Sequence, residues 1–302
     1  MGRMKYGYIG LGNLGGHLAA SLIRAGHEVV VYDRNGTLAE RHAALGAGVA
    51  TSPAELAAQV DHVFTCLPSP AASEAVLAQM LPAMRPGATW VENSTLGRED
   101  VLRLAGLARF TDVPMLEAPV TGGVHLAARG EITVLVGGDV DLYALHLPAL
   151  QAMGDKIFHM GPLGSAAVIK VITNMLALVH LVADGEALML AKRGGLDLKT
   201  AYEAISASSG TSFVHETEGQ LILNGSYDIA FSMDLALKDL GFAMGFGRDY
   251  GVPLDLASLV NQTFMKGKAV YGGKAQSTQI VKLLEDALNT DLRAEGFPAR
   301  LE

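Results

Sequence analysis

The chain has 302 residues, of which 50% are hydrophobic and 18% are charged. This length supports a large buried core and about two domains. The formal net charge of −8 excludes the basic footprint of a nucleic-acid-binding protein. The sequence lacks the clustered Cys and His spacings that are typical of a structural metal site. We therefore expect a compact protein with no nucleic-acid partner and no metal.

A membrane location is not predicted. The sequence contains no run of about 18 uninterrupted apolar residues that could span a bilayer. The most apolar stretch, residues 168–191, includes Lys170 and Asn174, so we interpret it as a buried helix. An apolar strand is expected from Lys5, which leaves no room for a signal peptide. The single cysteine, Cys66, lies in an apolar run and fits a reducing compartment. These features predict a soluble, cytoplasmic protein that does not bind membranes.

The first half of the chain alternates short β-rich runs with helical stretches, and glycines and prolines follow the runs where βα turns are needed. The expected strands span residues 6–9, 28–32, 62–66, 89–91, 133–136 and 156–159. This alternation is typical of an α/β, doubly wound parallel sheet.

After residue 164 the strand signals end and helical periodicity replaces them. The expected helices span residues 165–192, 197–207, 234–249, 254–271 and 278–289. The first would be about 40 Å long and would bridge two domains. We therefore predict a doubly wound (Rossmann) domain over 1–163, an interdomain helix over 164–193, an all-α substrate and dimerisation domain over 194–292, and a tail over 293–302.

A glycine-rich turn, Gly10-Leu11-Gly12-Asn13-Leu14-Gly15, follows the first strand and opens a helix. Gly10 would permit the tight turn, Gly12 would let the backbone approach a pyrophosphate, and Gly15 would allow close packing of helix on sheet. The helix N-terminus would supply amide donors and a positive dipole end. The sequence thus predicts a dinucleotide site, with an ordinary glycine-rich turn as the alternative.

The end of the second expected strand bears on the choice of dinucleotide. Asp33 lies eighteen positions beyond Gly15 and favours a free ribose 2′-hydroxyl, hence NAD. Arg34 beside it could accommodate a 2′-phosphate, so NADP stays open.

Four segments, in this order, resemble the β-hydroxyacid dehydrogenase family, which includes 3-hydroxyisobutyrate dehydrogenase and the tartronate semialdehyde, glyoxylate and succinic semialdehyde reductases. They are the glycine-rich turn, Glu117-Ala118-Pro119-Val120-Thr121-Gly122-Gly123, Gly161-Pro162-Leu163-Gly164 leading to Lys170 and Asn174, and Leu237-Lys238-Asp239-Leu240. The resemblance covers nearly the whole chain and is specific to the family rather than to one substrate. It implies a homodimer or homotetramer.

Lys170 and Asn174 are four residues apart, so they share one face of the expected interdomain helix. A dry cleft beside an oxidised nicotinamide would disfavour the charged form of a lysine and let it accept a proton. The resemblance implies that Lys170 is the general acid/base and that Asn174 orients the substrate. The alternative for Lys170 is a side chain that reaches from an apolar helix to solvent.

Thr121, Gly122 and Gly123 would present a hydroxyl and backbone amides at a helix start, which suits a carboxylate. The resemblance assigns them to substrate binding, with a plain turn as the alternative. The family usually has Asp and Ser where this chain has Glu117 and Thr121. Those differences keep a charge and a hydroxyl.

Further residues are implied around the cofactor and the substrate. Leu67 and Pro68 follow one expected strand and Ser94-Thr95 ends another, at the strand ends where open α/β sheets bind ligands. Ser94 or Thr95 could instead be the N-cap of the next helix. The resemblance places Lys238 at the nicotinamide end, with Asp239 and Phe231 as substrate-pocket candidates; a surface lysine and a core aromatic are the alternatives.

The leading hypothesis is thus an NAD(P)-dependent oxidoreductase that interconverts a small β-hydroxy acid and its semialdehyde. An NADPH-dependent glyoxylate, succinic or tartronate semialdehyde reductase is the alternative within the family. A decarboxylating 6-phosphogluconate dehydrogenase shares the pattern but needs a longer helical domain. A non-catalytic, cofactor-binding scaffold or regulator would be favoured if Lys170 were replaced, and it is present.

Overall fold

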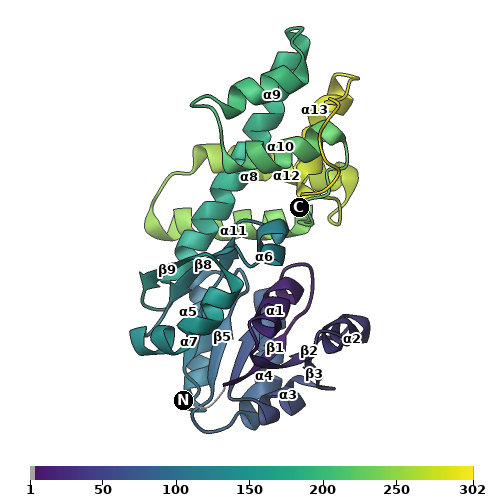
Figure 1. Cartoon of the computed structure of the whole chain (residues 1–302). Coiled ribbons are helices and arrows are strands. Elements are labelled where there is room, and N and C mark those ends of the chain that lie inside the picture. Colours follow the sequence, from purple (N-terminus) through teal and green to yellow (C-terminus); the bar gives the residue numbers. More distant parts are fainter. Residues whose placement is uncertain (1–3, 302) are drawn as a thin grey trace. The chain divides into compact units, whose positions relative to one another are not determined.

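The computed structural model describes residues 4–301 and divides into two compact units (Figure 1). We call the part up to Lys170 the sheet unit and the part from Val171 the helical unit. The chain passes from one to the other within helix α8 (Ser165–Arg193). This long helix corresponds closely to the one expected over residues 165–192.

The sheet unit is built on one mixed sheet, with strand order β3-β2-β1-β4-β5-β6-β8-β7 and β9 paired to β8. The pairs from β3 to β6 are parallel, whereas β8 runs antiparallel to β6 and β7. The strands are β1 (Lys5–Ile9), β2 (Glu28–Tyr32), β3 (Gly48–Val49), β4 (His62–Thr65), β5 (Thr89–Glu92), β6 (Met115–Glu117), β7 (Val120–Thr121), β8 (Thr133–Gly137) and β9 (Lys156–Gly161). The parallel part has the order of a doubly wound fold, so this prediction is confirmed.

Helices cover both faces of this sheet. The helices of the unit are α1 (Gly15–Arg24), α2 (Gly36–Ala43), α3 (Pro53–Gln59), α4 (Pro70–Met80), the 3₁₀ turn η1 (Leu81–Ala83), α5 (Arg98–Arg109), α6 (Val124–Arg129) and α7 (Val140–Met153). Residues of α1, α2, α6 and α7 form one buried cluster, and residues of α3, α4 and α5 form another. Successive strand residues point to opposite clusters: Val29 and Val31 to the first, Val30 to the second.

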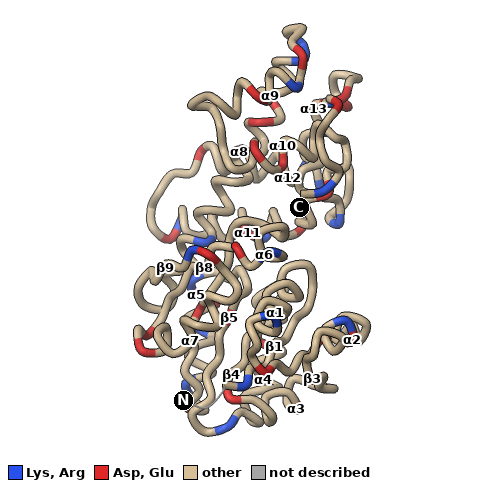
Figure 2. The backbone as a smooth tube through the Cα atoms, viewed as in Figure 1, with Lys and Arg blue, Asp and Glu red and all other residues tan. Residues whose placement is uncertain are grey.

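This packing explains why the strands are almost continuously apolar. A parallel strand that is covered on both faces has no solvated side. Charged residues therefore sit at the strand ends (Figure 2), as with Lys5 and Glu28, which begin β1 and β2 and are paired at 2.7 Å.

Among its described residues the helical unit contains helices, turns and one isolated β-bridge, between Ser232 and Gln276. The helical elements are the rest of α8, α9 (Leu198–Ser206), α10 (Phe213–Asn224), α11 (Met233–Tyr250), α12 (Asp255–Tyr271), the 3₁₀ turn η2 (Ser277–Val281) and α13 (Lys282–Ala287). Their apolar faces share one core, which includes Leu188, Ile222, Leu240 and Phe264. The expected all-α second half is confirmed.

Some elements differ from the sequence-based expectation. Strands β3, β6 and β7 have two or three residues each, too few to show a period. Helix α10 occupies a segment for which no helix was expected, and residues 278–289 form η2 followed by α13 rather than one helix.

The residues after α13, which the sequence predicts as a tail from 293, pack on the helical unit at their start. Leu292 is fully buried and its amide donates to Glu285 Oε1 at 2.7 Å. The Arg293 guanidinium binds the same oxygen at 3.0 Å and donates to the Tyr227 hydroxyl at 2.8 Å. Polar composition alone did not reveal these contacts.

Helix α8 was expected to be a buried helix, and this is correct for one side only. Leu178, Leu181 and Leu188 lie in the helical core, whereas Leu176 and Leu190 are exposed. Among residues 4–301, α8 alone is long and apolar enough to cross a membrane. One such helix is weak evidence of a membrane span, because core helices of soluble proteins share its composition.

Candidate active site

In the glycine-rich turn between β1 and α1, one glycine has free space where a Cβ atom would lie and two do not. At Gly10 (φ +94°) a Cβ atom would lie 2.3 Å from the Cys66 carbonyl oxygen, and at Gly15 it would lie 2.1 Å from the Gly10 carbonyl oxygen. At Gly12 it would meet no protein atom within 4 Å. The chain itself therefore requires glycine at positions 10 and 15, whereas position 12 leaves room for a ligand to approach the backbone.

The N-terminus of α1 is suited to an anion. Its N-cap residue, Leu14, provides no side-chain acceptor, and its first turn contains no acidic residue. The positive end of the helix dipole thus faces no capping carboxylate from this helix. Together with the open side at Gly12, this arrangement fits the pyrophosphate of a dinucleotide.

Asp33, at the end of β2, braces this turn. Its Oδ2 accepts the Leu11 amide at 2.7 Å and its Oδ1 accepts the Asn35 amide at 2.8 Å. The carboxylate is therefore fixed next to the glycine-rich turn, where a ribose would follow a bound pyrophosphate. Arg34 beside it is exposed.

The ends of β4 and β5 are joined through Ser94. The Leu67 amide donates to Ser94 Oγ at 2.7 Å, and the buried Glu92 accepts from both the amide and the hydroxyl of Ser94. Thr95 is half-buried and Pro68 is exposed. The N-cap of α5 is Gly97, so the alternative in which Ser94 or Thr95 caps that helix is wrong.

The segment Thr121 to Gly123 leads from β7 directly into α6, with Gly123 as its N-cap. Gly122 and Gly123 both have positive φ, at 124° and 90°. Side chains other than glycine rarely adopt such a backbone. The Thr121 side chain is half-buried. The expected arrangement, a hydroxyl followed by backbone amides at a helix start, is present.

Lys170 lies on α8 and is 7% exposed, one helical turn before the half-buried Asn174. The Asn174 amide group donates to Asp239 Oδ2 at 2.6 Å. The other oxygen of that carboxylate, Oδ1, is 2.9 Å from Lys238 Nζ. Asp239 is 1% exposed, so it holds Asn174 and Lys238 from inside the helical unit. The sequence suggested Asp239 for substrate contact; its oxygens bind these two side chains.

Phe231 precedes α11 and packs, half-buried, against the helical core. Its backbone amide donates to Gln276 Oε1 at 3.2 Å. These contacts support its alternative role as a core aromatic.

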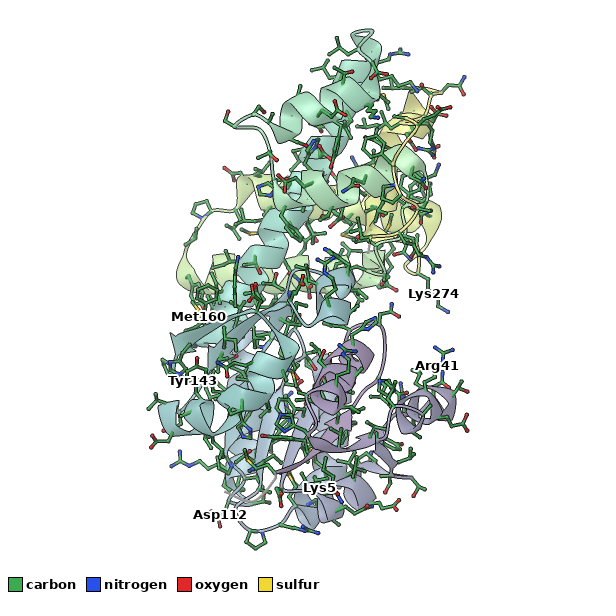
Figure 3. The ribbon with its side chains drawn as sticks, viewed as in Figure 1. Lys5, Arg41, Asp112, Tyr143, Met160 and Lys274 are labelled. Atoms are coloured by element: carbon green, nitrogen blue, oxygen red, sulfur yellow. The ribbon has the colours of Figure 1, made fainter. Side chains whose placement is uncertain are left out.

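The structure therefore brings the predicted residues together in two groups. In the sheet unit, the segments after β1, β2, β4 and β5 and the end of β6 share one edge of the parallel sheet. Figure 3 shows Lys5 and Asp112 at the opposite end of this unit, where strands begin. In the helical unit, Asn174, Lys238 and Asp239 form the second group. Among residues 4–301 no group of three or more His, Cys, Asp or Glu residues could hold a metal ion.

Two known protein families match the chain, one after the other. Residues 5–161 match the family described as the NAD-binding domain of 6-phosphogluconate dehydrogenase. Residues 164–284 match the family described as NAD-binding of NADP-dependent 3-hydroxyisobutyrate dehydrogenase. The two matches adjoin at residues 161–164, before the start of α8.

Individual relatives match over nearly the full length. The chain is 31% identical to 2-(hydroxymethyl)glutarate dehydrogenase of Eubacterium barkeri, over 93% of this chain and 95% of the relative. It is 33% identical to L-threonate dehydrogenase of Cupriavidus necator, over 92% and 95%. A solved structure of Mycobacterium tuberculosis 3-hydroxyisobutyrate dehydrogenase with L-serine is 30% identical, with a TM-score of 0.84, over 93% of this chain and 99% of that one.

Proposed function

Because the chain belongs to the β-hydroxyacid dehydrogenase family, we propose that it is an NAD(P)-dependent dehydrogenase that interconverts a small β-hydroxy acid and its semialdehyde. The observation that carries this proposal is the pair on α8: a buried lysine, Lys170, one turn before Asn174, whose amide is held by Asp239. A buried lysine is rare without a partner or a chemical role.

In this proposal Lys170 moves the proton. During oxidation its neutral amine accepts the proton of the substrate hydroxyl, and during reduction the ammonium returns it. A bound nicotinamide cofactor would supply the acceptor for the hydride of the hydroxyl-bearing carbon. Asn174 orients the substrate beside Lys170. Asp239 limits the rotation of the Asn174 amide, which reduces the entropy lost in reaching the reactive geometry.

The substrate class follows from shared chemistry. The relatives are named for 2-(hydroxymethyl)glutarate, L-threonate and 3-hydroxyisobutyrate, and each of these compounds is a carboxylate with a hydroxyl on the β-carbon. The hydroxyl of Thr121 and the amides of Gly122 and Gly123 suit the carboxylate. We assign Phe231 only to the border of the pocket, since it packs against the core.

For the cofactor, we propose that residues 10–15, Asp33, Leu67, Pro68, Thr95 and Lys238 contribute to binding. The Asp33 carboxylate favours NAD, because a 2′-phosphate would place like charges together. The exposed Arg34 favours the second candidate, an NADPH-dependent semialdehyde reductase of the same family. The presence of Lys170 argues against a non-catalytic scaffold.

We also propose a cytoplasmic location, supported by the single cysteine, and a homodimer or homotetramer, supported by exposed apolar side chains on the helical unit.

Absorbance at about 340 nm tests the function, because reduced nicotinamide reports hydride transfer directly. Wild type, Lys170→Ala and the control Lys192→Ala are compared with NAD and NADP across β-hydroxy acids and semialdehydes. Lys192 lies near the other end of α8, paired with Asp291 at 2.7 Å. We expect Lys170→Ala to lose kcat by roughly 10²–10⁴-fold with cofactor affinity unchanged, and Lys192→Ala to retain activity.

Two results would count against the proposal. Activity of Lys170→Ala equal to that of wild type would remove the catalytic assignment. Binding of both cofactors without turnover of any panel compound would favour the regulatory alternative.

A further inference from the structure

We propose that Glu117 is a positioning residue for this reaction: its carboxylate caps the N-terminus of α8 and thereby fixes the first turns of the helix, on which Lys170 lies. This inference rests on the proposed function of Lys170. Glu117 lies at the end of β6, far from α8 in the sequence, and no motif marks it as a cap.

Three backbone amides at the start of α8 donate to this one side chain. The Gly164 amide reaches Glu117 Oε1 at 2.6 Å, the Ala166 amide reaches the same oxygen at 3.0 Å, and the Ala167 amide reaches Oε2 at 3.0 Å. The first amides of any helix lack partners within that helix. Caps are usually supplied by the residue just before the helix, whereas here the acceptor comes from a strand 47 to 50 residues earlier.

The sheet makes room for this carboxylate. Glu117 is paired with Gly137 of β8, and a Cβ atom at position 137 would lie 2.1 Å from Glu117 Oε1. Gly137 does not have a positive φ, so its backbone conformation does not require glycine. The space that it leaves for Glu117 is the physical reason for glycine at this position.

The cap is adjacent to Lys170 along the helix. Ala166 and Ala167, whose amides are held, are four and three residues before Lys170, so they occupy the preceding turn on the same side of α8. A shift of that turn would move the Lys170 amine with it. Displacements of about 1 Å can lower the rate about 10²-fold.

The charge of Glu117 is set by opposing influences. Burial raises the pKa of Glu117 to about 7, while the three amide donors and the Arg98 guanidinium act to lower it. The cap therefore changes its protonation state in the neutral range, and a pH profile can report on it.

The experiment compares wild type with Glu117→Gln, Glu117→Asp and Gly137→Ala. Glu117→Gln keeps the size and removes the charge, Glu117→Asp keeps the charge, and Gly137→Ala displaces the carboxylate without altering it. Glu285→Gln is the matched control. Glu285 is also a buried carboxylate that accepts a backbone amide, but it lies in the helical unit, where it accepts hydrogen bonds from Tyr227 and Arg293. Thermal unfolding of each variant shows that it is folded.

Two readouts are taken. Hydrogen exchange of the amides of residues 164–170 reports on the cap without needing turnover, and we expect exchange about tenfold faster in Glu117→Gln and Gly137→Ala. Steady-state kinetics report on positioning: kcat should fall about tenfold or more, with the KM for cofactor within about twofold. The limb of the kcat profile near neutral pH should disappear in Glu117→Gln. Glu117→Asp should recover part of kcat, and Glu285→Gln should match wild type.

Unchanged exchange in both Glu117→Gln and Gly137→Ala would overturn the cap. Faster exchange with kcat and pH profile as in wild type would overturn the positioning role. If wild type turned over no hydroxy acid or semialdehyde, the proposed function and the link to Lys170 would fail together, and exchange would still decide whether Glu117 caps α8.

Discussion

Three glycines in the turn after β1 have different physical reasons to be glycine. A side chain at position 10 or 15 would collide with backbone oxygens of the chain itself, whereas one at position 12 would enter open space. Glycine at positions 10 and 15 is thus required by the fold, whereas glycine at position 12 leaves space for a ligand beside the turn. This division permits a test in which stability and binding respond to different substitutions.

We predict that Gly12→Ala leaves the free energy of unfolding within about 0.5 kcal/mol of wild type but weakens NAD(H) binding by about tenfold or more. Gly15→Ala should instead destabilise the fold by about 1–3 kcal/mol, because its Cβ would lie 2.1 Å from the Gly10 carbonyl oxygen. Urea unfolding and fluorescence titration with NADH measure the two quantities. Equal loss of stability in both variants would contradict the assignment of position 12 to the ligand.

Buried carboxylates act at a distance from their own segment in both units. Glu117 holds the start of α8 from β6, and Asp239 of α11 holds Asn174 of α8. Glu117 holds backbone amides at the start of the helix, whereas Asp239 limits the orientations of the Asn174 side chain. Preorganisation of this kind contributes to catalysis only if the held group touches the reactants.

At the scale of elements, a buried polar network joins α7 to the sheet. Thr89 Oγ1 is 2.9 Å from His62 Nδ1 and 2.6 Å from His146 Nε2, which links β5, β4 and α7. The two imidazole rings meet edge to face with centroids 4.8 Å apart. His62 and Thr89 begin their strands, so this network lies at the edge opposite the glycine-rich turn.

This network makes stability depend on pH. Burial, aided by the neighbouring His62, lowers the pKa of His146 to about 3. Below the unfolded value of 6.5 the unfolded chain takes up a proton that the folded chain does not. The contribution of His146 is therefore complete above pH 6.5 and is lost as the pH falls towards 3. We predict that, as the pH falls from 8 to 5, the free energy of unfolding of wild type decreases by about 2 kcal/mol more than that of His146→Gln.

The contribution of Glu117 to stability changes with pH in the opposite direction, so Glu117→Gln serves as the control. Its pKa is raised from 4.5 to about 7, so its contribution is complete below 4.5 and is lost as the pH rises through 7. As the pH falls from 8 to 5, the free energy of unfolding of wild type should rise by about 2 kcal/mol relative to that of Glu117→Gln. Urea unfolding at several pH values checks both. A His146→Gln profile parallel to that of wild type would contradict the first prediction.

At the scale of the whole molecule, the helical unit exposes apolar side chains that a solitary chain would not favour. On α12, Leu256, Leu259 and Val270 are 60%, 64% and 62% exposed, and their spacing places them on one side of the helix. Burial of such a side in a symmetric contact would remove it from water.

We therefore predict that wild type is a dimer or tetramer by size-exclusion chromatography with light scattering. Leu256→Asp combined with Leu259→Asp should reduce the mass to a smaller species, because charges would be buried in the contact. Phe110→Asp, at a 90% exposed position of the sheet unit, is the control and should leave the mass unchanged. A monomeric wild type, or a double variant of unchanged mass, would contradict the prediction.

The sequence by itself determined the fold class and the segments that carry chemistry. Strands buried on both faces must be apolar and helices with one buried face must be periodic, so both halves of the chain were predictable. The glycine-rich turn was also predictable, because its requirements are local: a tight turn, a close packing contact and a helix start, all within residues 10–15.

Only the tertiary structure decided how these residues are held. The cap of α8 by Glu117, the Asp239 contacts to Asn174 and Lys238, and the packing of Leu292 and Arg293 join residues distant in sequence. Strands β3, β6 and β7 were invisible for a related reason, since two or three residues cannot show a period and only pairing with neighbours defines them. Local pattern specifies elements, whereas a contact through space depends on where the folded chain returns.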